Sequence, residues 1–194
     1  MGFKIRYCKV IFIAFTLLFS AVFAWALDDG FSSAKTVEGK YTTTYYLPEM
    51  KTSDLIQKLN TRPSDDILSG IKALNKNSKE NELAASADSL LVQVSDILDM
   101  HAYSTKVIVK ICNNAGELQA LYRNMFAQEL GPRQSFYVYD TNSIYISEDS
   151  LKREILGHEM AHAVISRYFV IPAPIKIQEV LAMYVEYNLR RPAK

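Results

Sequence analysis

The clearest hydrophobic periodicity of the chain lies between residues 83 and 101. Apolar side chains recur there every three or four positions, at Leu83, Ala87, Leu90, Leu91, Val94, Ile97 and Leu98. This spacing places them on one face of an α-helix, so it predicts an amphipathic helix that ends near His101. The apolar run at 106–111 is short and rich in β-branched residues, and it indicates a strand.

The pattern continues with helix and strand signals up to the C-terminus. Asn114 and Glu117 have the spacing of a capping box, which predicts a helix that Gly131-Pro132 would end. Residues 134–147 are rich in aromatic and β-branched residues around a polar turn and predict two antiparallel strands. Two further helices are expected at about 151–169 and 176–189, separated by a loop with two prolines.

The pattern is weaker between residues 27 and 80. A strand is expected at 41–47 and short helices at 54–59 and 64–74, while the polar stretch 75–81 reads as a boundary or a long surface loop. We therefore expect an N-terminal extension at 27–80 and a domain at 81–194. The order of elements in that domain favours an α+β fold, with a small mixed sheet packed on helices, over repeated βαβ units.

The N-terminus has the features of a secretory signal peptide. Three basic residues precede an apolar run at 10–24, and Ala24-Trp25-Ala26 has small residues at the positions that a signal peptidase reads. We expect residues 1–26 to be removed from a secreted or periplasmic protein. The run is short for a membrane span and an acidic pair follows it, so no stable membrane insertion is expected after cleavage; the alternative is an uncleaved anchor.

Composition narrows the classes of function. The 194 residues carry a formal net charge of +1, which argues against a nucleic-acid binder that depends on a large basic surface. After removal of 1–26, Cys112 would be the only cysteine, so no intramolecular disulfide could form. An apolar core or a metal must then stabilise the fold, and Cys112 is expected to be a buried thiol.

The helix expected at 151–169 contains His158-Glu159-Met160-Ala161-His162. Residues four apart lie on the same helical face, so both imidazoles can bind one zinc ion. Glu159 is one residue further round, where its carboxylate can reach a water at the ion and act as general base. The alternative is a polar stripe that faces solvent, but apolar residues surround the two histidines, and burying unligated histidines would be costly.

A catalytic zinc ion needs a third protein ligand. No His, Cys or Asp follows His162, so the choice is reduced to Glu179 and Glu186. Ile165 and Tyr168 stand where the metzincin pattern requires Gly and His, which excludes that pattern. We therefore expect the third ligand to be a glutamate of the last helix.

With Glu179-Val180-Leu181-Ala182 after the HExxH motif, the sequence resembles the gluzincin zinc metallopeptidases, and it is most similar to their compact single-domain members, the minigluzincins. The resemblance implies a zincin-like α+β fold in which the C-terminal helix carries the third ligand. It also implies one Zn²⁺ ion held by His158, His162 and Glu179, with Glu159 as general base and proton shuttle.

One position departs from the family pattern. Many gluzincins have an Asp four residues after the glutamate ligand to orient a zinc histidine, and Met183 stands there in this chain. Another carboxylate must take this role, and the candidates are Asp140, Asp149 and Glu186. Glu186 is also the reserve ligand, because it lies seven residues from Glu179 on the same helical face.

Two further features of the family have candidates in the sequence. The strand signal Ile144-Tyr145-Ile146 resembles the family's edge strand, which pairs with extended substrate. A donor for the developing oxyanion is often a Tyr or His, and Tyr168, Tyr184 and Tyr187 are near the motif, although none can be assigned from the sequence.

The leading hypothesis is a secreted zinc-dependent endopeptidase, a hydrolase that acts on peptide or protein substrates and has no nucleic-acid partner. A second hypothesis is a non-catalytic, zinc-stabilised module that binds peptides or envelope components. In a third, residues 27–80 are a prosegment that covers the cleft of a latent enzyme.

Overall fold

The computed structural model describes residues 29–31, 35–71, 78–101 and 105–191. The chain divides into two compact units, Met1–Gly30 and Phe31–Lys194, and all elements described below belong to the second. The predicted signal peptide at 1–26 lies outside the described residues, as does the first part of the polar stretch 75–81. Within the described ranges, no helix is both long and apolar enough to cross a membrane.

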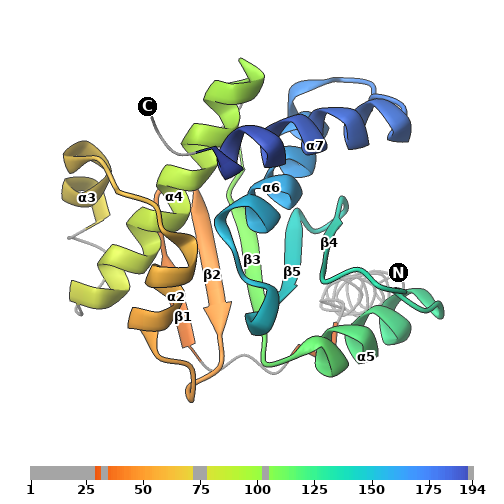
Figure 1. The fold of residues 1–194 in the computed structure, drawn as a ribbon, viewed down its shortest axis with the longest axis horizontal. Coiled ribbons are helices and arrows are strands. Elements are labelled where there is room, and N and C mark those ends of the chain that lie inside the picture. The colour runs from red at the N-terminus through yellow and green to blue at the C-terminus, as the bar shows by residue number, and fades with distance from the viewer. Residues whose placement is uncertain (1–28, 32–34, 72–77, 102–104, 192–194) are drawn as a thin grey trace, which may run out of the picture. The chain divides into compact units, whose positions relative to one another are not determined.

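Five strands form one mixed sheet in the order β1-β2-β3-β5-β4 (Figure 1). The central strands β2, β3 and β5 are parallel, and β1 and β4 run antiparallel to their neighbours at the two edges. The strands are β1 (Lys35–Glu38), β2 (Thr42–Tyr46), β3 (Val107–Cys112), β4 (Ser135–Val138) and β5 (Ser143–Ser147).

Six α-helices and a short 3₁₀ helix, η1, accompany the sheet in the described part of the chain, so the expected α+β class is confirmed. They are α2 (Thr52–Leu59), α3 (Asp65–Ile71), α4 (Ser78–Leu98), α5 (Ala115–Phe126), η1 (Glu148–Ser150), α6 (Arg153–Tyr168) and α7 (Ile175–Arg190).

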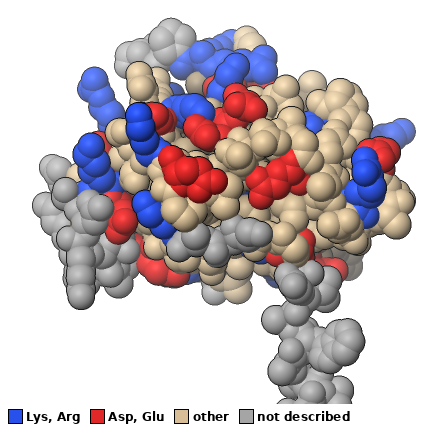
Figure 2. Space-filling view, turned by 90° about the horizontal axis from the view of Figure 1, so that it is seen from below, with Lys and Arg blue, Asp and Glu red and all other residues tan. Residues whose placement is uncertain are grey.

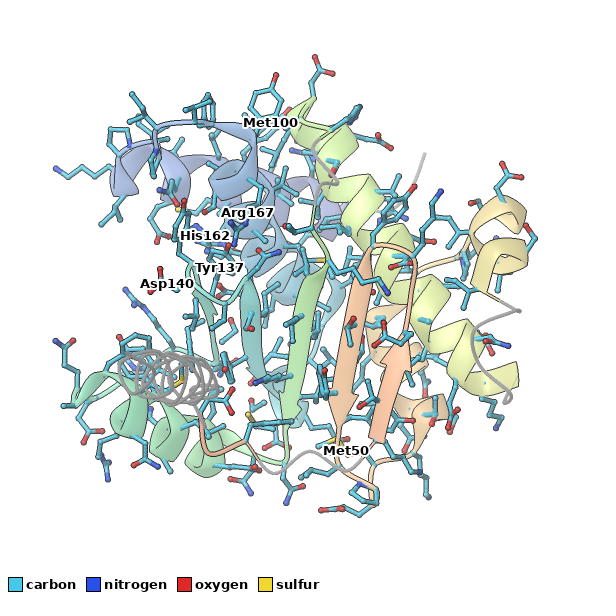
Figure 3. The ribbon with its side chains drawn as sticks, turned by 180° about the vertical axis from the view of Figure 1, so that it is seen from behind. Met50, Met100, Tyr137, Asp140, His162 and Arg167 are labelled. Carbon is cyan, nitrogen blue, oxygen red and sulfur yellow. The ribbon has the colours of Figure 1, made fainter. Side chains whose placement is uncertain are left out.

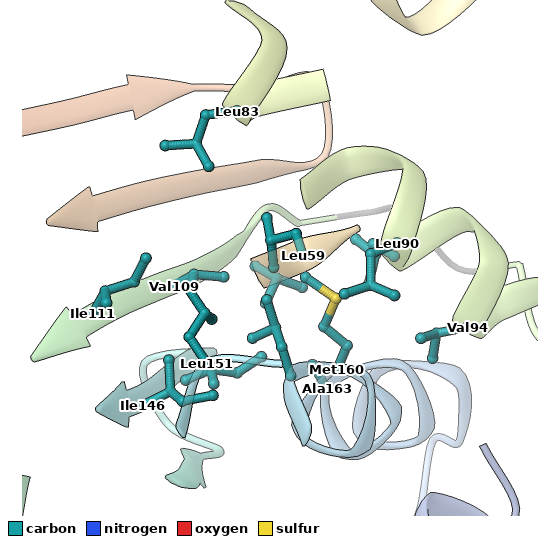
Figure 4. Packing of buried hydrophobic residues seen from close by; sticks show 14 of the residues in the cluster. Leu59, Leu83, Leu90, Val94, Val109, Ile111, Ile146, Leu151, Met160 and Ala163 are labelled. Carbon is teal, nitrogen blue, oxygen red and sulfur yellow. The ribbon is translucent and has the colours of Figure 1, made fainter. Parts of the chain in front are cut away.

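Alternation along the strands gives the sheet two buried faces. In β3, Val109 and Ile111 point to a main core that α4 and α6 complete with Leu90 and Met160, among others (Figure 4). The next residue, Cys112, points to the opposite face, where it joins a smaller cluster with residues of α5. The predicted burial of Cys112 is confirmed.

Residues of the expected N-terminal extension belong to this same sheet. β2 pairs with β3, and the boundary expected at residue 80 falls inside α4. The turn between β1 and β2 is fixed to α4 by Asp88, whose carboxylate accepts hydrogen bonds from the backbone N–H groups of Lys40, Tyr41 and Thr42 and from the Thr42 hydroxyl. A Cβ atom on Gly39 would lie only 2.5 Å from Asp88 Oδ1, so glycine allows this close approach. Removal of 27–80 would therefore take two strands out of the sheet.

Two expectations about element positions are wrong. α5 ends at Phe126 and not at Gly131-Pro132, because Ala127 adopts a left-handed conformation and its N–H caps the helix on the Arg123 carbonyl. The strand signal at 144–146 is part of β5, which lies between β3 and β4. The edge strand on this side of the sheet is β4.

Candidate metal centre

The candidate centre lies between α6 and α7. These two helices are antiparallel and are joined by the proline-containing loop at 169–174. Residue pairs in contact show the direction, because His158 faces Glu186 while His162 faces Glu179. Gly157 of α6 permits this close packing: a Cβ atom there would lie 2.1 Å from Cδ1 of Leu189. The helix pair thus brings the histidines of one helix against the glutamates of the other.

His158, His162 and Glu179 converge on one point. One ligand atom of each lies within 4.8 Å of the other two. The Nε2 atoms of His158 and His162 are each 3.7 Å from an oxygen of the Glu179 carboxylate, and the two rings are inclined at 67°. Two imidazole nitrogens and one carboxylate oxygen form a donor set that could hold a metal ion.

Glu186 fixes the orientation of His158. Its Oε2 atom is 3.0 Å from His158 Nδ1, and it also forms an ion pair with Arg190. A carboxylate can only accept this bond, so Nδ1 carries the proton and donates it. In the neutral ring, Nε2 then keeps the lone pair that points to Glu179, which is the tautomer a metal requires. Of the three carboxylates considered, Glu186 makes this contact, while no contact places Asp140 or Asp149 against either histidine.

The environment of the second histidine, His162, favours its neutral form. Burial, and after it the neighbouring His158, lowers the pKa of His162 below its ordinary value. Only the neutral imidazole has a lone pair to offer a metal ion, so this environment favours the ligand form.

Glu159 is buried beside the three converging residues, with 7% of its surface exposed. Its Oε1 atom accepts a hydrogen bond of 2.7 Å from the Ser135 hydroxyl on β4. Burial raises the pKa of Glu159, and the bond from Ser135 opposes this rise in part. A raised pKa makes a carboxylate a stronger base, which favours its taking a proton from a neighbouring group. Ser135 is not among the expected site residues, and its one sequence signal is that it is a small hydroxyl residue next to the aromatic pair Phe136-Tyr137.

These residues face a cleft of about 770 Å³ bounded by α5, β4, α6 and α7. Its lining is strongly aromatic, with Tyr122, Phe126, Phe136, Tyr137 and Tyr139. Figure 3 shows Tyr137 and Arg167 between the β4–β5 hairpin and α6, on the side where His162 lies. Tyr168, Tyr184 and Tyr187, the tyrosines considered from the sequence as oxyanion donors, are about half exposed and are not part of this lining.

No family model matches the chain, and no curated protein or solved structure is detectably similar to it.

Proposed function

We propose that this protein is a zinc-dependent endopeptidase of the gluzincin type, exported by its predicted signal peptide and active outside the cytoplasm. The observation that carries the proposal is the convergence of both histidine Nε2 atoms on the Glu179 carboxylate, with the tautomer of His158 fixed by Glu186. The order of these residues in the sequence, HExxH followed by a glutamate on the next helix, supports the same conclusion.

The donor set suits zinc. Two imidazoles and one carboxylate are the protein ligands of many hydrolytic zinc sites, which keep one position open. His158, His162 and Glu179 would hold the ion. When bound, zinc would supply a Lewis acid that polarises a scissile carbonyl and acidifies a water molecule.

Glu159 would move the proton. Ser135 occupies its Oε1 atom, which leaves Oε2 free to take a proton from the attacking water and pass it to the leaving amine. Burial favours the protonated form that this transfer creates. Ser135 therefore has a positioning role: it holds the carboxylate in one orientation within the cleft.

The cleft would bind the substrate as an extended chain. β4 has β5 as its neighbour on one side and lies at the edge of the sheet, so its outer side can pair with a peptide backbone. The aromatic lining from α5 and the hairpin offers contacts for apolar side chains of the peptide.

The test combines metal analysis with hydrolysis of an unfolded protein substrate. The wild-type protein should contain one zinc ion and lose its activity when a chelator is added. Glu159→Gln should keep the zinc and lose about 10²- to 10⁴-fold in turnover, the usual contribution of a general base. Glu154→Gln makes the same chemical change on the same helix outside the cleft lining and should retain activity.

Two outcomes would count against the proposal. An unchanged rate in Glu159→Gln would reject its role as base. Bound zinc without hydrolysis by the wild-type protein would favour the non-catalytic zinc module instead.

A further inference from the structure

Exposed apolar side chains are concentrated in one segment of the chain. Of the twelve large hydrophobic residues that are exposed in the described ranges, ten lie between Tyr168 and Tyr187. Val170 and Ile171, in the loop between α6 and α7, are 101% and 81% exposed. Such clustering is unusual for a surface that faces only water.

The outward side of α7 continues this apolar surface. Ile177, Val180, Tyr184 and Tyr187 follow one another at intervals of three and four residues and are all more than half exposed. The opposite side of the same helix, with Ala182, Val185 and Leu189, is buried in the core. A helix that is apolar on both sides is expected to be covered on both sides.

The charged residues of this segment have one sign on the outward side. Lys176 and Arg191 are exposed there, and the Arg191 guanidinium lies 4.3 Å from the centre of the Tyr187 ring. The two acidic residues of α7, Glu179 and Glu186, are turned towards the histidines of α6. By contrast, Figure 2 shows the face seen from below, away from α7, where acidic and basic side chains are intermixed.

An apolar helix face with aromatic residues, basic residues and no acidic ones matches the surface of an anionic lipid bilayer. The apolar side chains enter the boundary between headgroups and acyl chains, tyrosines favour that boundary, and Lys and Arg bind the anionic headgroups. We propose that the loop 169–174 and the outward side of α7, together called here the α7 surface, dock on a membrane that contains anionic lipid.

Docking would place the candidate centre beside the bilayer. Pro172 and Ile175, at the base of the α7 surface, also line the cleft. Peptide segments that emerge from a membrane would then be close to the site. The docking itself needs neither zinc nor hydrolysis, so it is tested independently of the proposed function.

The test uses the full chain with vesicles of phosphatidylcholine, alone or mixed with phosphatidylglycerol. Because the apolar N-terminal run could bind lipid itself, the readout must be local: hydrogen–deuterium exchange of the backbone amides at 168–176. We expect slower exchange at these amides on the mixed vesicles and much less change on phosphatidylcholine alone. Equal slowing on both would overturn the role of anionic lipid.

Variants assign the effect to particular side chains. Val170→Asp with Ile171→Asp replaces two exposed residues and should reduce the apparent affinity for mixed vesicles about tenfold or more. Ser53→Asp with Gln57→Asp adds the same charge at exposed positions of α2 and should have no such effect. Lys176→Gln with Arg191→Gln should weaken binding and reduce its dependence on salt.

Two results would overturn the proposal. The first is unchanged exchange at 168–176 on mixed vesicles. The second is slowing that depends on protein concentration without vesicles, which would assign the α7 surface to contact with a second copy of the chain.

Discussion

Replacing Glu186 with glutamine should weaken zinc binding at the candidate centre without abolishing it. In the native protein the Glu186 carboxylate accepts the Nδ1 proton of His158 at 3.0 Å and thereby keeps the lone pair on Nε2. A glutamine amide is neutral and can also turn its NH₂ group to Nδ1, which stabilises the tautomer that cannot bind zinc through Nε2. Loss of such a histidine partner usually lowers metal affinity about 10- to 100-fold, or about 1.4–2.8 kcal/mol.

The assay is the dissociation constant for zinc, measured by competition with a chromophoric chelator at pH 7.5. Arg190→Gln is a matched control, because it removes the other partner of Glu186 and leaves the contact with His158 in place. Arg190→Gln should lower the affinity for zinc less than Glu186→Gln does. Glu179→Gln changes a proposed ligand itself and should lower the affinity for zinc more than either of these variants.

Two results would refute this reasoning. Wild-type affinity in Glu186→Gln would mean that the contact with His158 does not matter for the metal. A loss as large as that of Glu179→Gln, or larger, would make Glu186 the ligand.

Three other predictions follow from buried groups. Metal-free Glu159→Gln should melt at a higher temperature than the metal-free wild type at pH 7.5, because burial raises the pKa of this carboxyl and charging it costs stability. The difference should shrink as the pH falls and should vanish below the ordinary glutamate value of 4.5, where the folded and unfolded states are both protonated. Asp88→Ala should lower the free energy of unfolding in urea by about 3–5 kcal/mol, because four hydrogen-bond donors at the β1–β2 turn lose their acceptor; a loss below 1 kcal/mol would contradict this. Gly157→Ala should lower the free energy of unfolding by about 1–3 kcal/mol, because the added methyl group overpacks against Leu189. When Gly157→Ala is combined with Leu189→Ala, the loss of free energy should be smaller than the sum of the losses in the two single variants.

Local signals in the sequence were sufficient for much of the fold. α5 begins where the capping pattern predicts: the Asn114 side chain accepts from the Glu117 N–H, and the Glu117 carboxylate accepts from the Asn113 N–H. The β4–β5 hairpin and the two last helices also lie close to their expected positions. Each of these elements is defined by contacts between residues near to one another in sequence, which a periodic pattern can report.

Features that depend on distant contacts were missed. β1 has only four residues and no clear alternation, and it forms a strand because β2 pairs with it. The order of strands does not follow from local patterns either, so the 144–146 signal predicts an edge strand, although β5 is flanked on both sides.

In the candidate centre, too, local features could be predicted from the sequence and distant contacts could not. Spacing on a helix places His158 and His162 on one face, and this much is local. Which carboxylate contacts which histidine depends on the register between α6 and α7, which is set by packing such as that of Gly157 against Leu189. Ser135 reaches Glu159 from another element, 24 residues earlier in the chain, and no local pattern could have paired them.

The most direct measurement of the central claim is an anomalous difference map from a crystal of the zinc-loaded protein, recorded on both sides of the zinc absorption edge. The account predicts one strong peak about 2.0–2.2 Å from the Nε2 atoms of His158 and His162 and from a carboxylate oxygen of Glu179. A peak that Glu186 ligates in place of Glu179, or no peak between α6 and α7, would contradict it.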